Sequence, residues 1–163
     1  DLHLLSRRQR QMCIETGLVE ALEKGNYNYL DRSKMSPRES LMAAYDADIF
    51  LSSANAVTND GILINIDGNS NRVSCIAQGP RKVVFIVGIN KVCSDLDSAM
   101  KRARNVAAPV NAQRFDLNIP CRETGKCFDC KSMDTICCQF LITRFSRHTD
   151  RIHVILVNDT LGY

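Results

Sequence analysis

The stretch Lys82-Val83-Val84-Phe85-Ile86-Val87 is almost continuously apolar and rich in β-branched residues. Such a run predicts a strand that is buried on both faces, as in a parallel sheet. Further apolar runs predict strands at residues 27–30, 48–52, 62–66, 140–143 and 152–157. Predicted helices at 6–24, after Ser36 and after Ser94 alternate with them. The sequence therefore predicts an α/β fold, a mostly parallel sheet with helices on both faces.

Local signals mark where several of these elements begin and end. Ser36-Pro37-Arg38-Glu39 combines a serine cap, a proline in the first turn and a capping-box glutamate. Ser6 and Ser94 are predicted caps of the other two helices, Gly25 is the predicted end of the first, and Pro109 is expected to end or bend the last. Residues 62–77, with the turn Asp67-Gly68-Asn69-Ser70-Asn71 between two apolar runs, predict an inserted β-hairpin.

Composition indicates an ordinary globular protein. The 163 residues are 45% hydrophobic and 24% charged, with a formal net charge of +3, which excludes a disordered chain. The basic run Lys101-Arg102-Ala103-Arg104 contains no aromatic residue, so we interpret it as a solvated helix face rather than a nucleic-acid site. The sequence contains neither an apolar run of the ~20 residues that a membrane helix needs nor a recognisable signal peptide. A cytoplasmic protein is expected.

Five of the eight cysteines lie between residues 121 and 138. Cys127 and Cys130 form a Cys-x-x-Cys pair, which Cys121 and Cys137 flank at distances that a loop can close. Four thiolates suit either tetrahedral zinc or an iron–sulfur cluster, and the residues do not decide between them. Cys138 and Cys137 are adjacent, so only one of the two is expected to bind.

Other residues and other interpretations bear on this segment. Gly125 offers backbone freedom, and Lys126 and Lys131 are expected to offset thiolate charge. A redox dithiol, disulfides and buried core cysteines are the alternatives. The isolated Cys13, Cys75 and Cys93 are interpreted as small buried hydrophobes.

Polar loops follow several of the predicted strands, where open α/β sheets bind ligands. Arg72 and Lys91 suit a carboxylate or phosphate, which predicts a site for a small anionic metabolite. Turn and capping roles are the alternative for these loops. The candidate ligand-binding residues are Ser52, Ser53, Asn55, Thr58, Asp67, Asn71, Arg72, Asn90 and Lys91.

Catalytic residues are not predicted. His3, His148 and His153 have no evident nucleophile beside them, and His153 is expected to be a hydrogen-bonded residue of the last strand. The sequence has neither a dinucleotide glycine fingerprint nor a Walker loop.

Many ordered segments together resemble the LUD domain of lactate-utilisation proteins (the lactate utilisation protein C type). They are Glu15-Thr16-Gly17-Leu18, Gly25-Asn26-Tyr27-Asn28, residues 47–61, 65–73 and 87–91, residues 105–112, Thr124-Gly125-Lys126-Cys127-Phe128-Asp129-Cys130, residues 151–158 and Leu161-Gly162-Tyr163. The resemblance implies a fold like that of sugar-phosphate isomerases and CoA-transferases. It also implies a link to oxidation of L-lactate to pyruvate, alongside iron–sulfur partner proteins.

Family members usually begin with a longer segment. The chain is therefore expected to be a single LUD-type domain over residues 1–163 that lacks it, with residues 120–138 as a metal-binding loop. The leading hypothesis is a protein of L-lactate or related hydroxy-acid use that binds a small anionic metabolite and carries a cysteine-bound iron–sulfur or metal centre in electron transfer. The alternatives are a non-redox sugar-phosphate or acyl-transfer enzyme with structural zinc, and a regulatory binding subunit. A homo-oligomer is left open.

Overall fold

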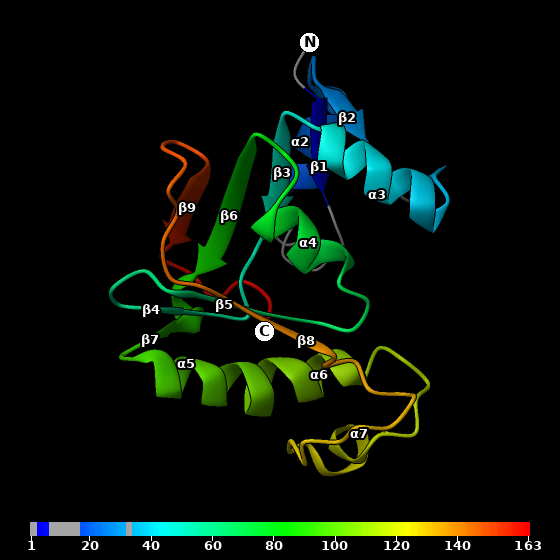
Figure 1. Cartoon of the computed structure of the whole chain (residues 1–163), viewed down its shortest axis with the longest axis vertical. Coiled ribbons are helices and arrows are strands. Elements are labelled where there is room, and N and C mark those ends of the chain that lie inside the picture. The colour runs from blue at the N-terminus through cyan, green and yellow to red at the C-terminus, as the bar shows by residue number, and fades with distance from the viewer. Residues whose placement is uncertain (1–2, 7–16, 32–33) are drawn as a thin grey trace. The chain divides into compact units, whose positions relative to one another are not determined.

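The computed structural model describes residues 3–6, 17–31 and 34–163 (Figure 1). Contacts divide the chain into two compact units, each assembled from segments that are distant in the sequence. Unit 1 contains Asp1–Ser53, Ser74–Ile89 and Ser146–Gly162, and unit 2 contains Ala54–Val73, Asn90–Phe145 and Tyr163. Each unit has its own sheet and its own apolar clusters.

Unit 1 is built on a five-stranded sheet with the order β2-β1-β3-β6-β9, in which every neighbouring pair is parallel. The run predicted as a strand buried on both faces is β6. Val83, Phe85 and Val87 on one face are fully buried, while Val84 and Ile86 on the other face are only half-buried. The predicted α/β fold with a mostly parallel sheet is confirmed. The strands are β1 (His3–Ser6), β2 (Asn28–Leu30), β3 (Ile49–Ser52), β6 (Lys82–Gly88) and β9 (Ile152–Val157).

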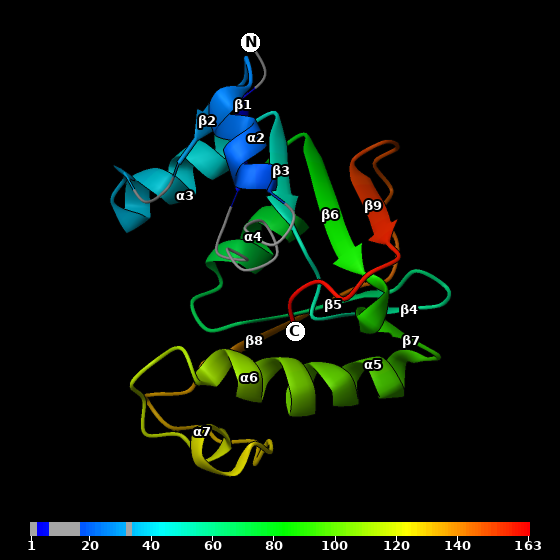
Figure 2. The same cartoon turned by 180° about the vertical axis from the view of Figure 1, so that it is seen from behind.

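Helices α2 (Leu18–Lys24) and α3 (Pro37–Asp46) belong to this unit and lie on opposite faces of its sheet (Figures 1 and 2). Leu22 of α2 is buried in a cluster with Leu51 of β3. The helix predicted over residues 6–24 is confirmed from Leu18, and Gly25 ends it as expected. The prediction was wrong at Ser6, which belongs to β1, and residues 7–16 lie outside the described part.

The capping box at the start of α3 is confirmed. The backbone N–H of Glu39 donates to the Ser36 hydroxyl at 3.3 Å, and the Glu39 carboxylate accepts from the Ser36 N–H at 2.9 Å. Pro37 occupies the first turn, where its missing N–H costs nothing. The hydrogen bond to the Ser36 side chain lowers the pKa of Glu39, so the box favours the charged carboxylate.

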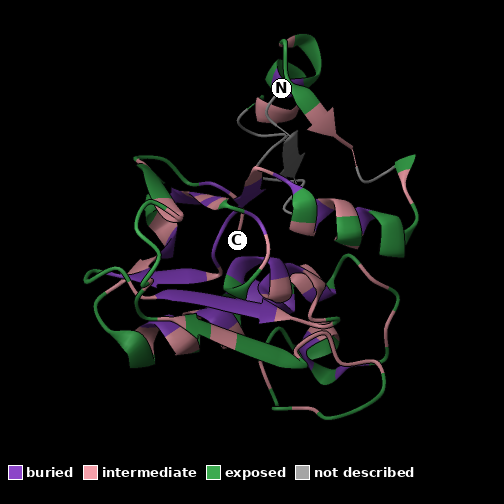
Figure 3. Cartoon of the chain, turned by 45° about the horizontal axis from the view of Figure 1, so that its top comes forward, coloured by how far each residue is buried: buried purple, intermediate pink, exposed green. Residues whose placement is uncertain are grey.

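Unit 2 is built on a four-stranded mixed sheet with the order β7-β4-β5-β8. Strand β5 pairs antiparallel with β4 on one side and with β8 on the other, and β4 pairs parallel with β7. Buried positions concentrate in β4 and β5, whereas β8 at the edge of this sheet is mostly exposed (Figure 3). The strands are β4 (Ala56–Thr58), β5 (Leu63–Asp67), β7 (Val92–Cys93) and β8 (Gln139–Thr143).

A nearly continuous helical stretch covers one face of this sheet (Figures 1 and 2). It consists of α5 (Leu96–Arg102), the π-helical turn η3 (Ala103–Ala107) and α6 (Ala108–Ala112). Ala99 and Ala103 are fully buried against Ile64 and Ile66 of β5. Pro109 neither donates a backbone hydrogen bond nor fits a regular helix interior, and the wider η3 turn just before it lets the helix continue.

The predicted cap of α5 was wrong by one residue. Asp95 is the cap, and its carboxylate accepts the N–H of Ser98 at 2.8 Å. The hydroxyl of Ser94 instead donates to Asp95. A carboxylate is the better acceptor next to the positive helix end, which explains the choice.

The β-hairpin predicted over residues 62–77 was also wrong in its second half. Residues Asn71–Ala77 form the helix α4, and β5 pairs instead with β4 and β8. The Asp67 carboxylate accepts the N–H groups of Asn69, Arg72 and Val73 at 3.0, 2.8 and 3.1 Å. These bonds satisfy free donors at the start of a helix, so the polar turn initiates α4 instead of closing a hairpin.

The basic run on the helical stretch is only partly solvated. Lys101 is exposed and pairs with Asp97. Arg102 instead packs inward and donates to the Asn90 carbonyl at 3.0 Å and the Asn55 carbonyl at 2.5 Å. The predicted solvated face was therefore wrong for Arg102. Within the described residues, no helix is long and apolar enough to cross a membrane.

Replacing Ser36 with alanine is expected to lower the free energy of unfolding by about 1 kcal/mol, because the first turn of α3 loses its side-chain acceptor. Urea unfolding followed by circular dichroism measures the change. Glu39→Gln is the matched control, since an amide oxygen still accepts from the Ser36 N–H. Equal stability of the wild type and Ser36→Ala would show that the box contributes nothing.

Candidate metal centre and polar network

Four cysteines line one small pocket in unit 2. The pocket has a volume of about 30 Å³. The four are the cysteines that the sequence predicts as metal ligands, so the chain brings them together, while their ligand role stays a prediction. The lining residues are Arg104, Ala108, Cys121, Cys127, Phe128, Asp129, Cys130, Cys137 and Phe140.

Short turns bring the first three cysteines to the pocket. Cys121 lies in the first turn of α7 (Pro120–Thr124), which packs beside α6 (Figures 1 and 2). Gly125 ends α7 with φ +70°, and its N–H donates to the Cys121 carbonyl at 3.0 Å. This left-handed position suits glycine and turns the chain toward Cys127. Asp129 also has a positive φ, of 53°, which bends the chain between Cys127 and Cys130.

The sulfur of Cys127 accepts two N–H groups. The Arg104 Nη2 and the backbone N of Asp129 each lie 3.5 Å from Cys127 Sγ. Arg104 comes from the η3 turn, and its guanidinium also forms an ion pair with Asp129 at 2.7 Å. A thiol sulfur is a weak acceptor, and here two N–H groups from different parts of the chain lie against the same sulfur.

Thr135 forms hydrogen bonds with three of the cysteines. Its hydroxyl oxygen accepts the N–H of Cys137 at 3.4 Å and lies 3.6 Å from Cys130 Sγ. Cys138 is exposed, and its sulfur donates to the Thr135 carbonyl at 3.7 Å. Of the two adjacent cysteines, Cys137 is thus the one that lines the pocket.

Backbone packing on the β5–α4 turn fixes the position before Cys137. A Cβ at Gly68 would lie 3.2 Å from the Ile136 carbonyl oxygen. This distance is shorter than almost all real contacts of a Cβ, so glycine permits the close approach of the two chain segments. The cysteine segment therefore packs, through Ile136, against the turn that precedes α4.

Burial keeps two of the thiols neutral. It raises the pKa of Cys137 to about 12, with the neighbouring cysteines as smaller causes, and it also raises the pKa of Cys121. Both are therefore protonated at neutral pH when no cation is near. A bound cation would displace these protons, because the thiolate is the metal-binding form.

The donor set fits a thiophilic metal. Zinc and iron–sulfur clusters both take cysteine sulfur, whereas magnesium and calcium take oxygen. In residues 3–6, 17–31 and 34–163, no three His, Cys, Asp or Glu side chains are already arranged as a coordination sphere. Rotation of the cysteine side chains within the pocket would therefore have to accompany binding.

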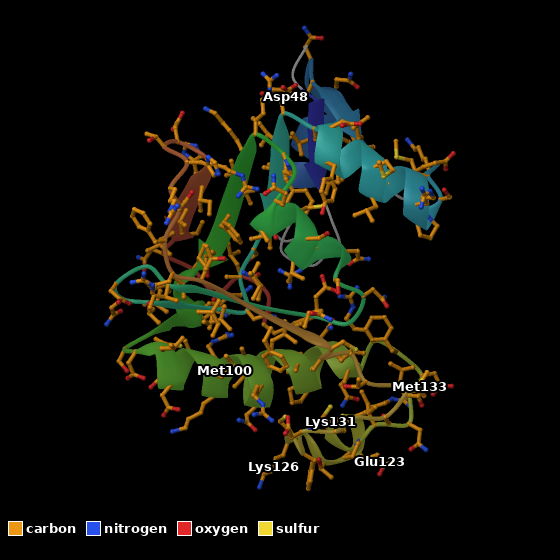
Figure 4. All side chains as sticks on the ribbon, viewed as in Figure 1. Asp48, Met100, Glu123, Lys126, Lys131 and Met133 are labelled. Atoms are coloured by element: carbon orange, nitrogen blue, oxygen red, sulfur yellow. The ribbon has the colours of Figure 1, made fainter. Side chains whose placement is uncertain are left out.

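Sequence reasoning missed Arg104, Asp129 and Thr135. Arg104 was assigned to a solvated helix face together with Lys101, because residues three positions apart lie on the same side of a helix. The charge partners expected from the sequence were Lys126 and Lys131, which are both exposed on the cysteine segment (Figure 4). Only the fold brings Arg104 to a residue 23 positions later in the chain.

The polar network of unit 2 is centred on Arg72, which is only 9% exposed. Its guanidinium donates to Asn65 Oδ1 at 2.6 Å, to the Ile66 carbonyl at 2.8 Å and to Asn55 Oδ1 at 3.4 Å. Three of the predicted ligand-binding residues, Asn55, Asp67 and Arg72, are therefore brought together. Asn65 was missed because it lies inside an apolar run.

One buried donor in this network has no hydrogen-bond partner. The fully buried Asn65 has a side-chain nitrogen, Nδ2, that makes no hydrogen bond. Its oxygen is held by Arg72, so the unpaired amide lies beside the guanidinium. A buried donor without a partner costs about 1–3 kcal/mol, which makes the position a candidate for contact with an acceptor of a ligand.

The remaining predicted ligand-binding residues lie in other places. Thr58 has a turn role, since its hydroxyl accepts the Ile62 N–H at 2.8 Å and donates to Asp60. Asn71 begins α4, and the buried Lys91 ends the short 3-10 helix η2 (Ile89–Lys91), which also contains Asn90. Ser52 and Ser53 belong to unit 1 and are buried, with the Ser52 hydroxyl donating to the Ser53 carbonyl at 3.3 Å.

The other cysteines and histidines agree in part with expectation. Cys75 is fully buried, which confirms the prediction, while Cys93 is partly exposed and Cys13 lies outside the described residues. His153 is in β9, and its Nε2 lies 2.9 Å from the Asp150 carbonyl oxygen. His148 is exposed.

Comparisons with known proteins point to one family. The model of the LUD domain matches residues 10–157. No curated protein matches the chain. Among solved structures, a DUF162 family protein from Deinococcus radiodurans is similar over 96% of this chain and 88% of that chain, with 13% identity and a TM-score of 0.43.

Alkylation should separate the two adjacent cysteines. The pKa of about 12 at Cys137 leaves far less thiolate at pH 8 than an ordinary thiol has. Higher intrinsic reactivity of the thiolate offsets only part of this, so Cys137 is expected to react about 30-fold or more slowly than the exposed Cys138. Iodoacetamide labelling of metal-free protein, read by tandem mass spectrometry, measures both rates.

The pH dependence provides the check on this assignment. Labelling of Cys137 should keep rising as the pH increases from 8 to 10, because its thiol is still mostly protonated there. Denatured protein is the control, in which the two cysteines should react alike. Equal rates in the folded protein would contradict the burial of Cys137.

Proposed function

Because the chain belongs to the LUD domain family, whose members are associated with lactate utilisation, we propose that it serves the use of L-lactate or a related hydroxy acid. In this proposal it works in the cytoplasm, binds a small carboxylate through the polar network of unit 2, and carries a metal centre on the cysteine pocket. The observation that carries the proposal is the buried Arg72 guanidinium beside the unpaired Asn65 amide.

The chemistry of this pair supports a carboxylate ligand. A carboxylate has two acceptor oxygens and carries negative charge, and a hydroxy acid adds a hydroxyl beside it. Arg72 supplies the positive charge and Asn65 Nδ2 supplies a free N–H. Hydrogen bonds to a charged partner in a buried setting are stronger than neutral ones, so both donors would favour an anion over a neutral sugar.

The cysteine pocket supports the second part of the proposal. Four cysteines and Arg104 line one cavity, and two N–H groups lie against the sulfur of Cys127. An iron–sulfur cluster there would supply electron transfer for oxidation of the hydroxy acid, and zinc would supply structural support. Partner proteins with iron–sulfur centres would be needed to accept electrons if this chain has none.

Binding of L-lactate and pyruvate tests the metabolite site. Nuclear magnetic resonance titration of the full chain should show saturable shifts for residues around Arg72, and glucose 6-phosphate should compete less well. Asn65→Asp keeps the oxygen that accepts from Arg72, removes the free N–H and adds negative charge. It is expected to weaken binding at least about tenfold, the equivalent of one charge-assisted hydrogen bond.

The control is Arg81→Gln, which removes an exposed arginine of unit 1 and should leave binding unchanged. Circular dichroism of each variant establishes that it is folded. Tight binding of glucose 6-phosphate with no response to lactate or pyruvate would contradict the hydroxy-acid assignment and favour a sugar-phosphate ligand. No response to any of the three would remove the metabolite site.

A further inference from the structure

We infer that the cysteine pocket binds a single zinc ion through Cys121, Cys127, Cys130 and Cys137, with Arg104 as the positioning residue for Cys127. This inference rests on the proposed cysteine-bound centre and names its metal, its ligands and its charge partner. Four thiols would lose their protons to solvent as the ion binds, which leaves four thiolates around one dication.

The size of the pocket argues for one ion. A cavity needs about 10–15 Å³ to hold one water-sized particle, and this cavity has about 30 Å³. It accommodates a single metal ion with its sulfur ligands turned inward. A cavity with room for one such particle favours a single ion over a cluster of several iron and sulfide ions.

The arrangement of the ligands argues for a closed tetrahedral site. Cys121 starts α7, the Cys127–Cys130 pair forms the tight turn, and Cys137 arrives just before β8. Three separate short segments thus each bring a cysteine to the lining of one cavity. Structural zinc sites are four-coordinate and commonly use a Cys-x-x-Cys turn together with two ligands from flanking chain.

Two N–H groups lie against the sulfur of Cys127, as the outer groups around a metal ligand do. The Asp129 N–H comes from the residue two positions later, so the turn itself directs a backbone donor at the sulfur. Arg104 donates to the same sulfur from the π-helical turn η3. Pro109, two residues after the end of η3, favours this wider turn. Outer groups that hydrogen-bond a metal ligand orient it and tune the affinity of the site.

The ion pair of Arg104 and Asp129 connects the two donors of this sulfur. Asp129 holds the guanidinium at 2.7 Å while its own N–H donates to the sulfur. One residue of the Cys-x-x-Cys turn therefore fixes both donors. Four thiolates and one zinc ion carry a net charge of −2, and the guanidinium offsets part of it.

The metal content of the full chain tests the inference. The protein is produced with zinc and iron both supplied, purified without oxygen, and analysed for zinc, iron and labile sulfide. One zinc per chain without sulfide is expected. Iron together with sulfide would overturn the zinc assignment but would still support a cysteine-bound centre. A protein that contains neither zinc nor iron would overturn the zinc assignment and the cysteine-bound centre alike. Lactate binding, measured separately, reports on the metabolite site alone.

Cysteine variants test the ligand set. Cys130→Ser and Cys137→Ser should lose zinc, while Cys138→Ser is the matched control and should keep one zinc per chain. A variant that fails to fold is recognised by circular dichroism. For that case, cobalt titration of chelated wild-type protein provides a second readout, and it should give the visible spectrum of a tetrahedral four-thiolate site. A spectrum of an octahedral site would overturn the ligand set.

Arg104 is tested by affinity and by rescue. Arg104→Met keeps the length of the side chain without donors or charge, and should weaken cobalt and zinc binding about 10- to 100-fold. Arg104→Lys should restore part of the affinity, and the charge-transfer bands of the cobalt form should shift in Arg104→Met only. Lys101→Met, on the same helical stretch but exposed, is the control. An unchanged affinity in Arg104→Met would remove Arg104 from the site.

Discussion

The turn between Asp67 and Arg72 is the constraint on which the rest of unit 2 depends. The Asp67 carboxylate accepts hydrogen bonds from the first N–H groups of α4. The guanidinium of Arg72, which lies in α4, donates hydrogen bonds to oxygens of β5 and of Asn55. A guanidinium this deeply buried is tolerated only when its donors are paired, because an unpaired buried charge costs several kcal/mol. The network therefore fixes β5, the strand to which β4 and β8 both pair.

The same turn also supports the cysteine segment. Glycine at position 68 lets the Ile136 backbone pack closely, and Cys137 follows directly. The polar network and the thiol pocket are thus parts of one unit that share a piece of backbone. A change in the backbone of this turn would therefore affect both the polar network and the thiol pocket.

The segment between α6 and β8, which contains the cysteines, has little regular secondary structure and little apolar packing to stabilise it. Between α6 and β8, the one regular element that the structure describes is the single-turn helix α7. Its apolar cluster is small, with Ala112, Ile119 and Cys121 buried. A cluster of this size contributes little against the entropy of ordering a long loop. A metal that binds four sulfurs would stabilise it by joining positions that the chain itself holds only through turns and single hydrogen bonds.

The sequence by itself determined the features that depend on near neighbours. The β-branched run of β6, the capping box at Ser36 and the grouping of cysteines were all readable, because period, cap chemistry and spacing act within a few residues. Local signals failed where two structures suit the same residues. The polar turn at Asp67 satisfies a hairpin or a helix start equally well, and only pairing of β5 with β4 and β8 made it the latter.

The tertiary structure decided which side chains face the site. Nothing local distinguishes Cys137 from Cys138, or Arg104 from Lys101, since each pair differs only in the direction in which it points. The directions of these side chains follow from the packing of the Ile136 backbone on Gly68 and from the η3 turn. Contacts between segments far apart in the sequence set these directions, and so the grouping of the cysteines was visible in the sequence while the geometry of the pocket was not.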